Sequence, residues 1–414
     1  MLPWLLDQLA RVGPDVPLAG LGKITLRAAL AAVVSFLLAM LLGPRLIAWL
    51  RRRFREPIKS DSPELQRLHR HKQSTPTMGG LFIVAGLLAA ALCFGDLGNG
   101  HLLVALLVTA GLALLGAVDD LKKLRGTGKG ISARAKLAGQ LAVALVAAVL
   151  LFDQLSTAPD GLLLRVPLAG WEIPLGFWFV PWAVLVIVGS SNAVNLTDGL
   201  DGLAGGCLLF AVGATTALCY AAGHAEWATY LGVARVPGAG EVTVLAGAAL
   251  GALLGFLWFN CHPAQVFMGD TGALPLGGLL GVFALIARQE LLLVLIGGVF
   301  VVEALSVILQ VGYFRWRRRR IFRCAPLHHH FQLAGWPESR IVVRFWIAAA
   351  LCALVGLASL KVRVHEQPGR KGDGANLCEA GHRPKVGRGP FRQISPVPFS
   401  RHDAVTAVGN TNAR

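Results

Sequence analysis

The chain has 414 residues, of which 55% are hydrophobic and 15% are charged, and its mean hydropathy is +0.60. Soluble domains carry a charge on about a quarter of their residues, so this composition excludes an ordinary soluble protein and a disordered chain. The apolar residues form long blocks, and about 18 apolar residues are enough for a helix to cross a bilayer. The sequence therefore predicts an all-α polytopic integral membrane protein.

Ten apolar blocks are predicted to span the membrane. In chain order, the predicted spans are residues 26–49, 78–95, 101–118, 135–152, 174–191, 203–221, 242–260, 272–287, 290–313 and 341–360. Several blocks are rich in glycine, which is common in membrane helices because it lets neighbouring helices approach closely.

Lysine and arginine are divided unevenly between the connections of these spans. Loops 44–77, 119–136 and 314–340 together hold 22, whereas the connections on the opposite side hold 5. Cytoplasmic loops carry the excess of these residues, so the first set is predicted to be cytoplasmic and both termini periplasmic. Because membrane orientation accounts for the net charge of +16, no nucleic acid partner is predicted.

The last part of the chain, residues 364–414, differs in character from the rest. It is polar, rich in proline and glycine, and shows no hydrophobic periodicity, which is typical of a disordered segment. The chain is therefore divided into a ten-helix transmembrane domain, residues 1–363, and a disordered C-terminal tail that takes no part in the chemistry.

Aspartate residues gather at the predicted cytoplasmic ends of several spans. Asp119 and Asp120 close the third span, Asp198 and Asp201 follow the fifth, and Asp270 precedes the eighth. Acidic residues next to a membrane are costly and are usually paired or functional. Carboxylate ligands without cysteine favour Mg²⁺, which commonly shares its coordination with substrate phosphates. We therefore expect an active site on the cytoplasmic face, suited to phosphoryl-type transfer between a cytosolic diphosphate and a lipid.

A basic segment before the second predicted span is suited to an anionic ligand. Lys72 and Thr77 lie just before the glycines of residues 79–80, where a helix is expected to begin. Free backbone N–H groups and the helix dipole both favour an anion at such a place. An ordinary capped helix start with cytoplasmic positive charge is the alternative for this segment.

Three consecutive histidines, His328, His329 and His330, lie in the arginine-rich loop 314–340. Neighbouring side chains diverge and a spaced fourth ligand is missing, so contact with a phosphorylated or nucleotide ligand is favoured over zinc. The arginines of this loop are suited to anionic lipid headgroups. Glu303 lies within the ninth predicted span and is expected to pair with an inward-facing donor.

At these residues the sequence closely resembles the phospho-N-acetylmuramoyl-pentapeptide transferase family, bacterial enzymes that make lipid I. The segments that carry the resemblance are His69-x-x-Lys72 with Thr75 to Gly80, Asp119-Asp120, Asn192 to Ala204, Phe267 to Asp270, His328 to Phe331, Gly335 to Glu338, and Arg344 to Trp346. Two departures are visible. Ser74 replaces the usual glycine of the family, and the tail from Val364 onward has no counterpart in it.

The resemblance implies transfer of phospho-MurNAc-pentapeptide from UDP-MurNAc-pentapeptide to undecaprenyl phosphate, with release of UMP. It also implies a multi-pass protein of the bacterial cytoplasmic (inner) membrane, dependence on Mg²⁺, and a homodimer. The residues it implies for catalysis are Asp119, Asp120, Asp270 and His328, and the three aspartates are also the implied metal ligands, with Asp270 as the main one. The residues it implies for substrate binding are Lys72, Thr77, Asn192, Asn195, Asp198, Asp201, Phe267, His329 and His330.

The expected chemistry is direct attack of the lipid phosphate on the β-phosphorus of the donor, and a covalent phospho-aspartyl route stays open. The nearest alternative is a sister enzyme that moves another sugar phosphate, such as GlcNAc-1-phosphate, onto a polyprenyl phosphate. The alternative from a different class is an ion-coupled transporter. Transporters often carry internal repeats and broken helices at mid-membrane, whereas here the acids lie at helix ends and no internal repeat is found.

Overall fold

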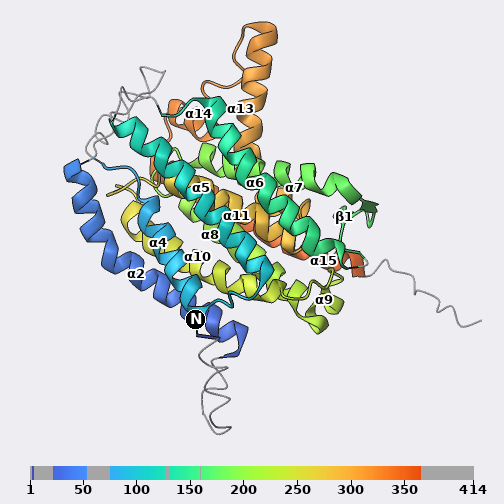
Figure 1. The fold of residues 1–414 in the computed structure, drawn as a ribbon. Coiled ribbons are helices and arrows are strands. Elements are labelled where there is room, and N and C mark those ends of the chain that lie inside the picture. The colour runs from blue at the N-terminus through green and yellow to red at the C-terminus, as the bar shows by residue number, and fades with distance from the viewer. Residues whose placement is uncertain (1, 4–21, 54–74, 126–129, 159, 365–414) are drawn as a thin grey trace, which may run out of the picture. The chain divides into compact units, whose positions relative to one another are not determined.

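The computed structural model describes residues 2–3, 22–53, 75–125, 130–158 and 160–364, all of which lie in the first of two units, Met1–Gln367. This part of the chain is helical apart from one short hairpin (Figure 1). The longer helices are α2 (Ile24–Arg53), α4 (Gly80–Phe94), α5 (Gly100–Arg125), α6 (Ala133–Ser156), α7 (Phe179–Thr197), α8 (Leu203–Gly223), α10 (Ala239–Asn260), α11 (Asp270–Ile286), α13 (Gly298–Arg317) and α15 (Glu338–Val364). The short elements are β1 (Leu163–Arg165), β2 (Glu172–Pro174), η3 (Gly176–Trp178), α9 (Ala225–Leu231), α12 (Leu292–Ile296) and α14 (Leu327–Leu333).

The prediction of an all-α polytopic membrane protein is confirmed. Within the described residues, eight helices are long and apolar enough to cross a membrane, and two further apolar helices, α4 and α11, have 15 and 17 residues. These ten helices correspond in order to the ten predicted spans. The ninth predicted span, 290–313, proved to be two helices, because the chain breaks at Gly297 between α12 and α13. The number of actual crossings and the side on which the termini lie stay predictions.

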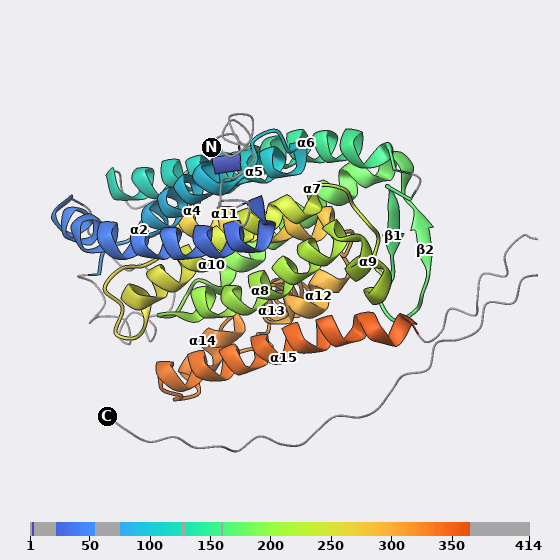
Figure 2. The same ribbon diagram turned by 90° about the horizontal axis from the view of Figure 1, so that it is seen from below.

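The centre of the fold is formed by α10 and α11. Helix α10 packs against α2, α4 and α8, while α11 packs against α5 and α7, and every residue of α11 is buried. The view in Figure 2 places α8 and α10 between α5 on one side and α15 on the other. A helix surrounded by other helices has no polar face to present, which explains why α11 is apolar after its first two residues, Asp270 and Thr271.

Glycine spacing explains how closely α2 lies on α10. Gly247, Gly251 and Gly255 recur every four residues and therefore share one face of α10. A Cβ atom on Gly251 would overlap the carbonyl oxygen of Ala32 in α2. Small residues at this spacing are what membrane helices use to bring their backbones together.

A buried ion pair joins the same two helices near their N-terminal ends. Arg27 of α2 makes two hydrogen bonds to the carboxylate of Glu241 in α10, at 2.6 and 2.8 Å. The Glu241 carboxylate also accepts the backbone N–H of Asp96 at 2.7 Å. Since each charge is paired and hydrogen-bonded, the pair can be kept in a buried position.

Candidate active site

Three aspartates come together where α5 ends and α11 begins. Asp119 and Asp120 lie on the last turns of α5, and Asp270 is the first residue of α11; all three are buried. One carboxylate oxygen from each lies within 4.8 Å of the others, so the group can hold a metal ion. The close approach depends on Gly116, because a Cβ atom there would overlap the backbone of Asp270.

Two lysines lie against this cluster. Nζ of Lys123 and Nζ of Lys136 are each 2.7 Å from Oδ2 of Asp270, and Lys123 is also 3.0 Å from Oδ2 of Asp119. Both lysines are partly buried, so their attraction to the carboxylates is less screened than at an open surface. Neither lysine is among the site residues predicted from the sequence. The signal available for Lys123 was its spacing of three and four residues from the aspartates on one helix.

The two neighbouring aspartates of α5 make different contacts. Asp120 accepts the backbone N–H groups of Asp270 at 3.3 Å and Thr271 at 2.9 Å, together with the Thr271 hydroxyl at 2.7 Å. It therefore caps the N-terminus of α11, whose first N–H groups have no partner within the helix. Asp119 accepts the N–H of Ile131 at 2.6 Å and faces the two lysines.

The polar residues at the end of α7 divide between two neighbours. Nδ2 of Asn195 donates to Oδ1 of Asp270 at 2.5 Å, which brings Asn195 into the cluster. Asn192 faces α6 instead, where its amide pairs with the amide of Gln140 at 3.0 and 3.3 Å. Asp198 follows the helix and is partly exposed. Loss of hydration, and then the negative charge of Asp270, raise the pKa of Asp198 to about 7.

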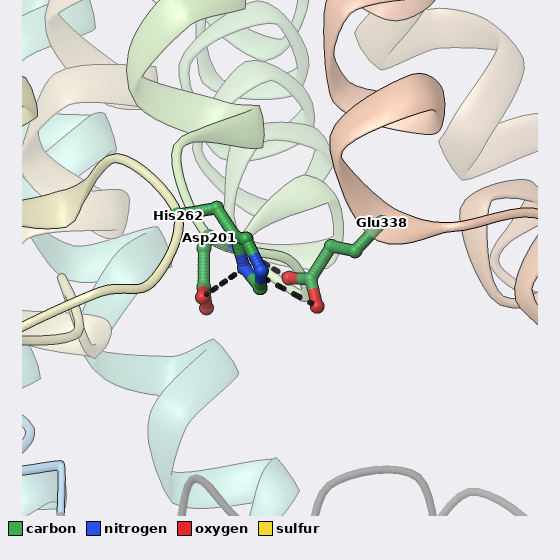
Figure 3. Close-up of side chains that lie close together, drawn as sticks. All are labelled: Asp201, His262 and Glu338. Atoms are coloured by element: carbon green, nitrogen blue, oxygen red, sulfur yellow. Dashed lines mark hydrogen bonds and ion pairs between the residues drawn. The ribbon is translucent and has the colours of Figure 1, made fainter.

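Asp201 belongs to a second cluster, formed with His262 and Glu338 (Figure 3). Oδ2 of Asp201 lies 3.0 Å from Nδ1 of His262, and it also accepts the N–H of Ala264 at 3.1 Å. The backbone N–H of Asp201 donates to Oε1 of Glu338 at 2.8 Å. These bonds tie together the loops that follow α7 and α10 and the start of α15. His262 and Glu338 were not among the predicted site residues.

The segment before α4 is held against the segment before α11. Phe267 accepts the N–H of Gly79 at 2.8 Å, and its own N–H donates to the carbonyl of Pro76 at 2.9 Å. Gly269 has a φ of +73°, and a Cβ atom on it would lie 2.7 Å from Asp120 and 2.9 Å from the hydroxyl of Thr77. Thr77 and Phe267 are thus next to the aspartates, and their role in substrate binding stays a prediction. Lys72 lies outside the described residues.

The histidine triplet forms part of α14. His328 is buried against Glu303 of α13, and a Cβ atom on Gly199 would overlap its Nε2 atom. This places His328 beside the loop that carries Asp198. Nδ1 of His329 lies 2.8 Å from Oε1 of Gln332, and Nδ1 of His330 accepts the backbone N–H of Arg323 at 3.2 Å.

Comparison with known proteins shows extensive similarity. The model of the Glycosyl transferase family 4 matches residues 102–288, a range that includes all three aspartates of the cluster. A protein of Solidesulfovibrio magneticus is 49% identical over 346 residues, and one of Nitratidesulfovibrio vulgaris Hildenborough is 50% identical over 343 residues. A protein of Thermodesulfovibrio yellowstonii is 47% identical over 344 residues. Each alignment covers 82% of this chain and 94% of the relative, and each relative is named phospho-N-acetylmuramoyl-pentapeptide-transferase.

Proposed function

The chain belongs to the phospho-N-acetylmuramoyl-pentapeptide-transferase family, and from this premise we propose that it transfers phospho-MurNAc-pentapeptide from UDP-MurNAc-pentapeptide to undecaprenyl phosphate, forming lipid I and UMP. It is a multi-pass protein of the bacterial inner membrane. The observation that carries the proposal is the buried group of three aspartates and two lysines at the ends of apolar helices. Such a site gives a cytosolic diphosphate access to a phosphate anchored in the membrane.

The donor set of this site suits Mg²⁺. Asp119, Asp120 and Asp270 offer carboxylate oxygens alone, and hard oxygen ligands of this kind are those that Mg²⁺ prefers. Asp270 and Asp119 are the better placed ligands, because both oxygens of Asp120 already accept hydrogen bonds from the start of α11. When bound, Mg²⁺ supplies positive charge that stabilises the transferring phosphoryl group.

The reaction can proceed by direct displacement. An oxygen of the lipid phosphate attacks the sugar-linked β-phosphorus of the donor, the new P–O bond forms, and the P–O bond to UMP breaks so that UMP leaves as an anion. A phosphate monoester is already largely ionised at neutral pH, since its second pKa is about 6, so a general base is not required. Lys123 and Lys136 are placed to neutralise charge on the reacting phosphates, and Asp119 to orient the acceptor.

The donor is proposed to bind on the side of the cluster where the ends of several segments meet. Asn195 and Thr77 lie next to the aspartates, and Phe267 and Asp198 lie on the neighbouring loops. Asp201 supports this region through its bonds to His262 and Glu338. We assign binding of the uridine-diphosphate sugar to these residues together with Lys72 and the histidine triplet, and we retain the homodimer as an expectation.

An apolar cavity supports binding of the acceptor chain. It has a volume of about 270 Å³ and lies between α7, α12 and α13, with Trp182, Leu185 and Phe300 among its lining residues. Its wall continues along α7 to Val194, which directly precedes Asn195, a contact of Asp270. A polyprenyl chain in this cavity would therefore have a path toward the aspartates.

Filling this cavity is expected to weaken binding of the acceptor lipid. Gly189 lines the cavity, and a Cβ atom added there meets no atom within 4 Å, so Gly189→Phe projects into the space without disturbing the helix. The KM for undecaprenyl phosphate is expected to rise about tenfold, with the KM for the donor unchanged. Gly213→Phe is the matched control, because Gly213 of α8 has equally open surroundings and does not line the cavity. Equal KM values for the two variants would contradict the assignment.

The function itself is tested by release of UMP from the purified protein in detergent with undecaprenyl phosphate and Mg²⁺. UDP-MurNAc-pentapeptide is expected to support release, UDP-GlcNAc is not, and a chelator is expected to reduce release to background until Mg²⁺ is restored. Release with UDP-GlcNAc alone would overturn the proposed substrate. Absence of release with either donor, after reconstitution in a bilayer, would favour the transporter alternative.

A further inference from the structure

A fully buried carboxylate, that of Glu303, lies in the N-terminal half of α13. Both Glu303 and His328 have side chains with 0% exposure. Oε1 of Glu303 accepts the backbone N–H of His328 at 3.1 Å, and Oε2 lies 3.2 Å from Nδ1 of the same residue. An acidic side chain inside an apolar helix is costly and marks a functional pairing. Here both oxygens serve a single histidine on another helix.

This contact determines where the ring of His328 carries its proton. An ionised carboxylate can only accept hydrogen bonds. Oε1 of Glu303 accepts the backbone N–H of His328, so Oε2 of Glu303 accepts a hydrogen bond from the ring when Nδ1 of His328 carries the proton. Nε2 is then unprotonated and can accept a hydrogen bond from another partner. In functional histidines generally, the hydrogen bond made by one ring nitrogen sets the protonation of the other.

Nε2 points at the loop after α7. Among the described residues it is a buried polar atom without a hydrogen-bond partner, and Gly199 lies so close to it that a Cβ atom would overlap the ring. Gly199 directly follows Asp198, which we place in the donor site. A buried polar atom without a hydrogen-bond partner is unfavourable, and a hydrogen bond from a ligand would offset that cost.

We propose that Glu303 is a positioning residue of the transferase: it holds the proton of His328 on Nδ1 and directs Nε2 toward the donor site, where Nε2 accepts a hydrogen bond from an O–H or N–H group of the nucleotide sugar. The inference deepens the proposed function and rests on it. It gives α13, which lines the acceptor cavity with Phe300 and with Ala304, the residue that follows Glu303, a direct connection to donor binding.

The variant Glu303→Gln tests this proposal with little change in shape. Its amide oxygen can accept the backbone N–H of His328 while its NH₂ group donates to Nδ1, which moves the ring proton to Nε2 and removes the acceptor. The kcat/KM for UDP-MurNAc-pentapeptide is expected to fall by about 10- to 100-fold, the loss typical for a residue that orients a functional histidine. The KM for undecaprenyl phosphate and the dependence on Mg²⁺ are expected to stay unchanged. In protein labelled with ¹⁵N-histidine, the Nδ1 and Nε2 resonances of His328 are expected to exchange their protonated and unprotonated shifts.

Ser306→Ala is the matched control, because Ser306 is buried on the same helix and donates to the carbonyl of Glu303 at 2.7 Å. It is expected to show wild-type kinetics. Loss of activity in His328→Ala with normal kinetics in Glu303→Gln would overturn the positioning role alone, whereas normal kinetics in His328→Ala would also overturn the proposed role of the histidine. Should Glu303→Gln not fold, Gly199→Ala displaces Nε2 from the other side, and a wild-type donor KM in that variant would contradict the proposal.

Discussion

Replacing Asp270 by asparagine is expected to lower the rate of UMP release by about 10²–10³-fold, the loss found when one main electrostatic group of an active site is removed. The carboxylate of Asp270 forms ion pairs with Lys123 and Lys136 and accepts a hydrogen bond from Asn195. It is also the proposed main ligand of Mg²⁺. Asparagine has nearly the same size but carries no charge, so the fold is expected to persist. The measurement is the initial rate at a series of Mg²⁺ concentrations.

The control for this variant is Asp153→Asn, which changes an exposed aspartate near the C-terminus of α6. It is expected to leave both the rate and the Mg²⁺ dependence as in the wild type. Near-normal turnover of Asp270→Asn with the wild-type response to Mg²⁺ would remove Asp270 from the metal site.

Replacing Asp120 by asparagine is expected to reduce both turnover and stability. The carboxylate accepts three hydrogen bonds from the first two residues of α11, and a negative charge at a helix N-terminus is favourable. Asparagine replaces one of the two accepting oxygens by an NH₂ group, which cannot accept a hydrogen bond. At least one buried donor of α11 then has no acceptor, at a cost of about 1–3 kcal/mol. The midpoint of thermal unfolding in detergent is expected to fall, and the rate of UMP release is expected to fall with it.

Asp119→Asn is the comparison that separates the two aspartates. The Asp119 carboxylate accepts the backbone N–H of Ile131 in a loop and otherwise faces lysines. Its replacement is therefore expected to lower turnover with a smaller change in the unfolding midpoint than in Asp120→Asn. If Asp119→Asn is the less stable of the two variants, the capping role of Asp120 is wrong.

The two lysines explain how three carboxylates share one buried place. Three negative charges within a few ångströms repel one another strongly where water is excluded. Lys123 comes from the same helix as two of the aspartates, and Lys136 comes from the start of α6. These cations reduce the repulsion and remain available to the phosphates of the substrates, which is an arrangement typical of phosphoryl transfer sites.

Hydropathy and charge were sufficient to predict the helical class and the ten apolar segments, because whether a helix can cross a bilayer depends on the apolar residues of that segment alone. They also predicted that Asp119, Asp120 and Asp270 lie at helix ends on one side. The break at Gly297 was missed, since a glycine within an apolar block has no signature that separates a kink from a continuous helix. The break became visible only with the packing of α12 and α13.

Side-chain direction and long-range contact were beyond the sequence alone. Successive residues on a helix point about 100° apart, so Asp119 and Asp120 face different neighbours, and only the position of α11 shows which one caps it. The links of Lys136 to Asp270 and of Glu303 to His328 join residues 134 and 25 positions apart, and Asp201 turned toward His262 and Glu338. The amino-acid sequence by itself determined which segments are apolar enough to enter a membrane and where charge is tolerated, because these depend on solvation of each segment. The tertiary structure decided which charged groups meet, because that depends on the rotation and spacing of helices that are distant in the chain.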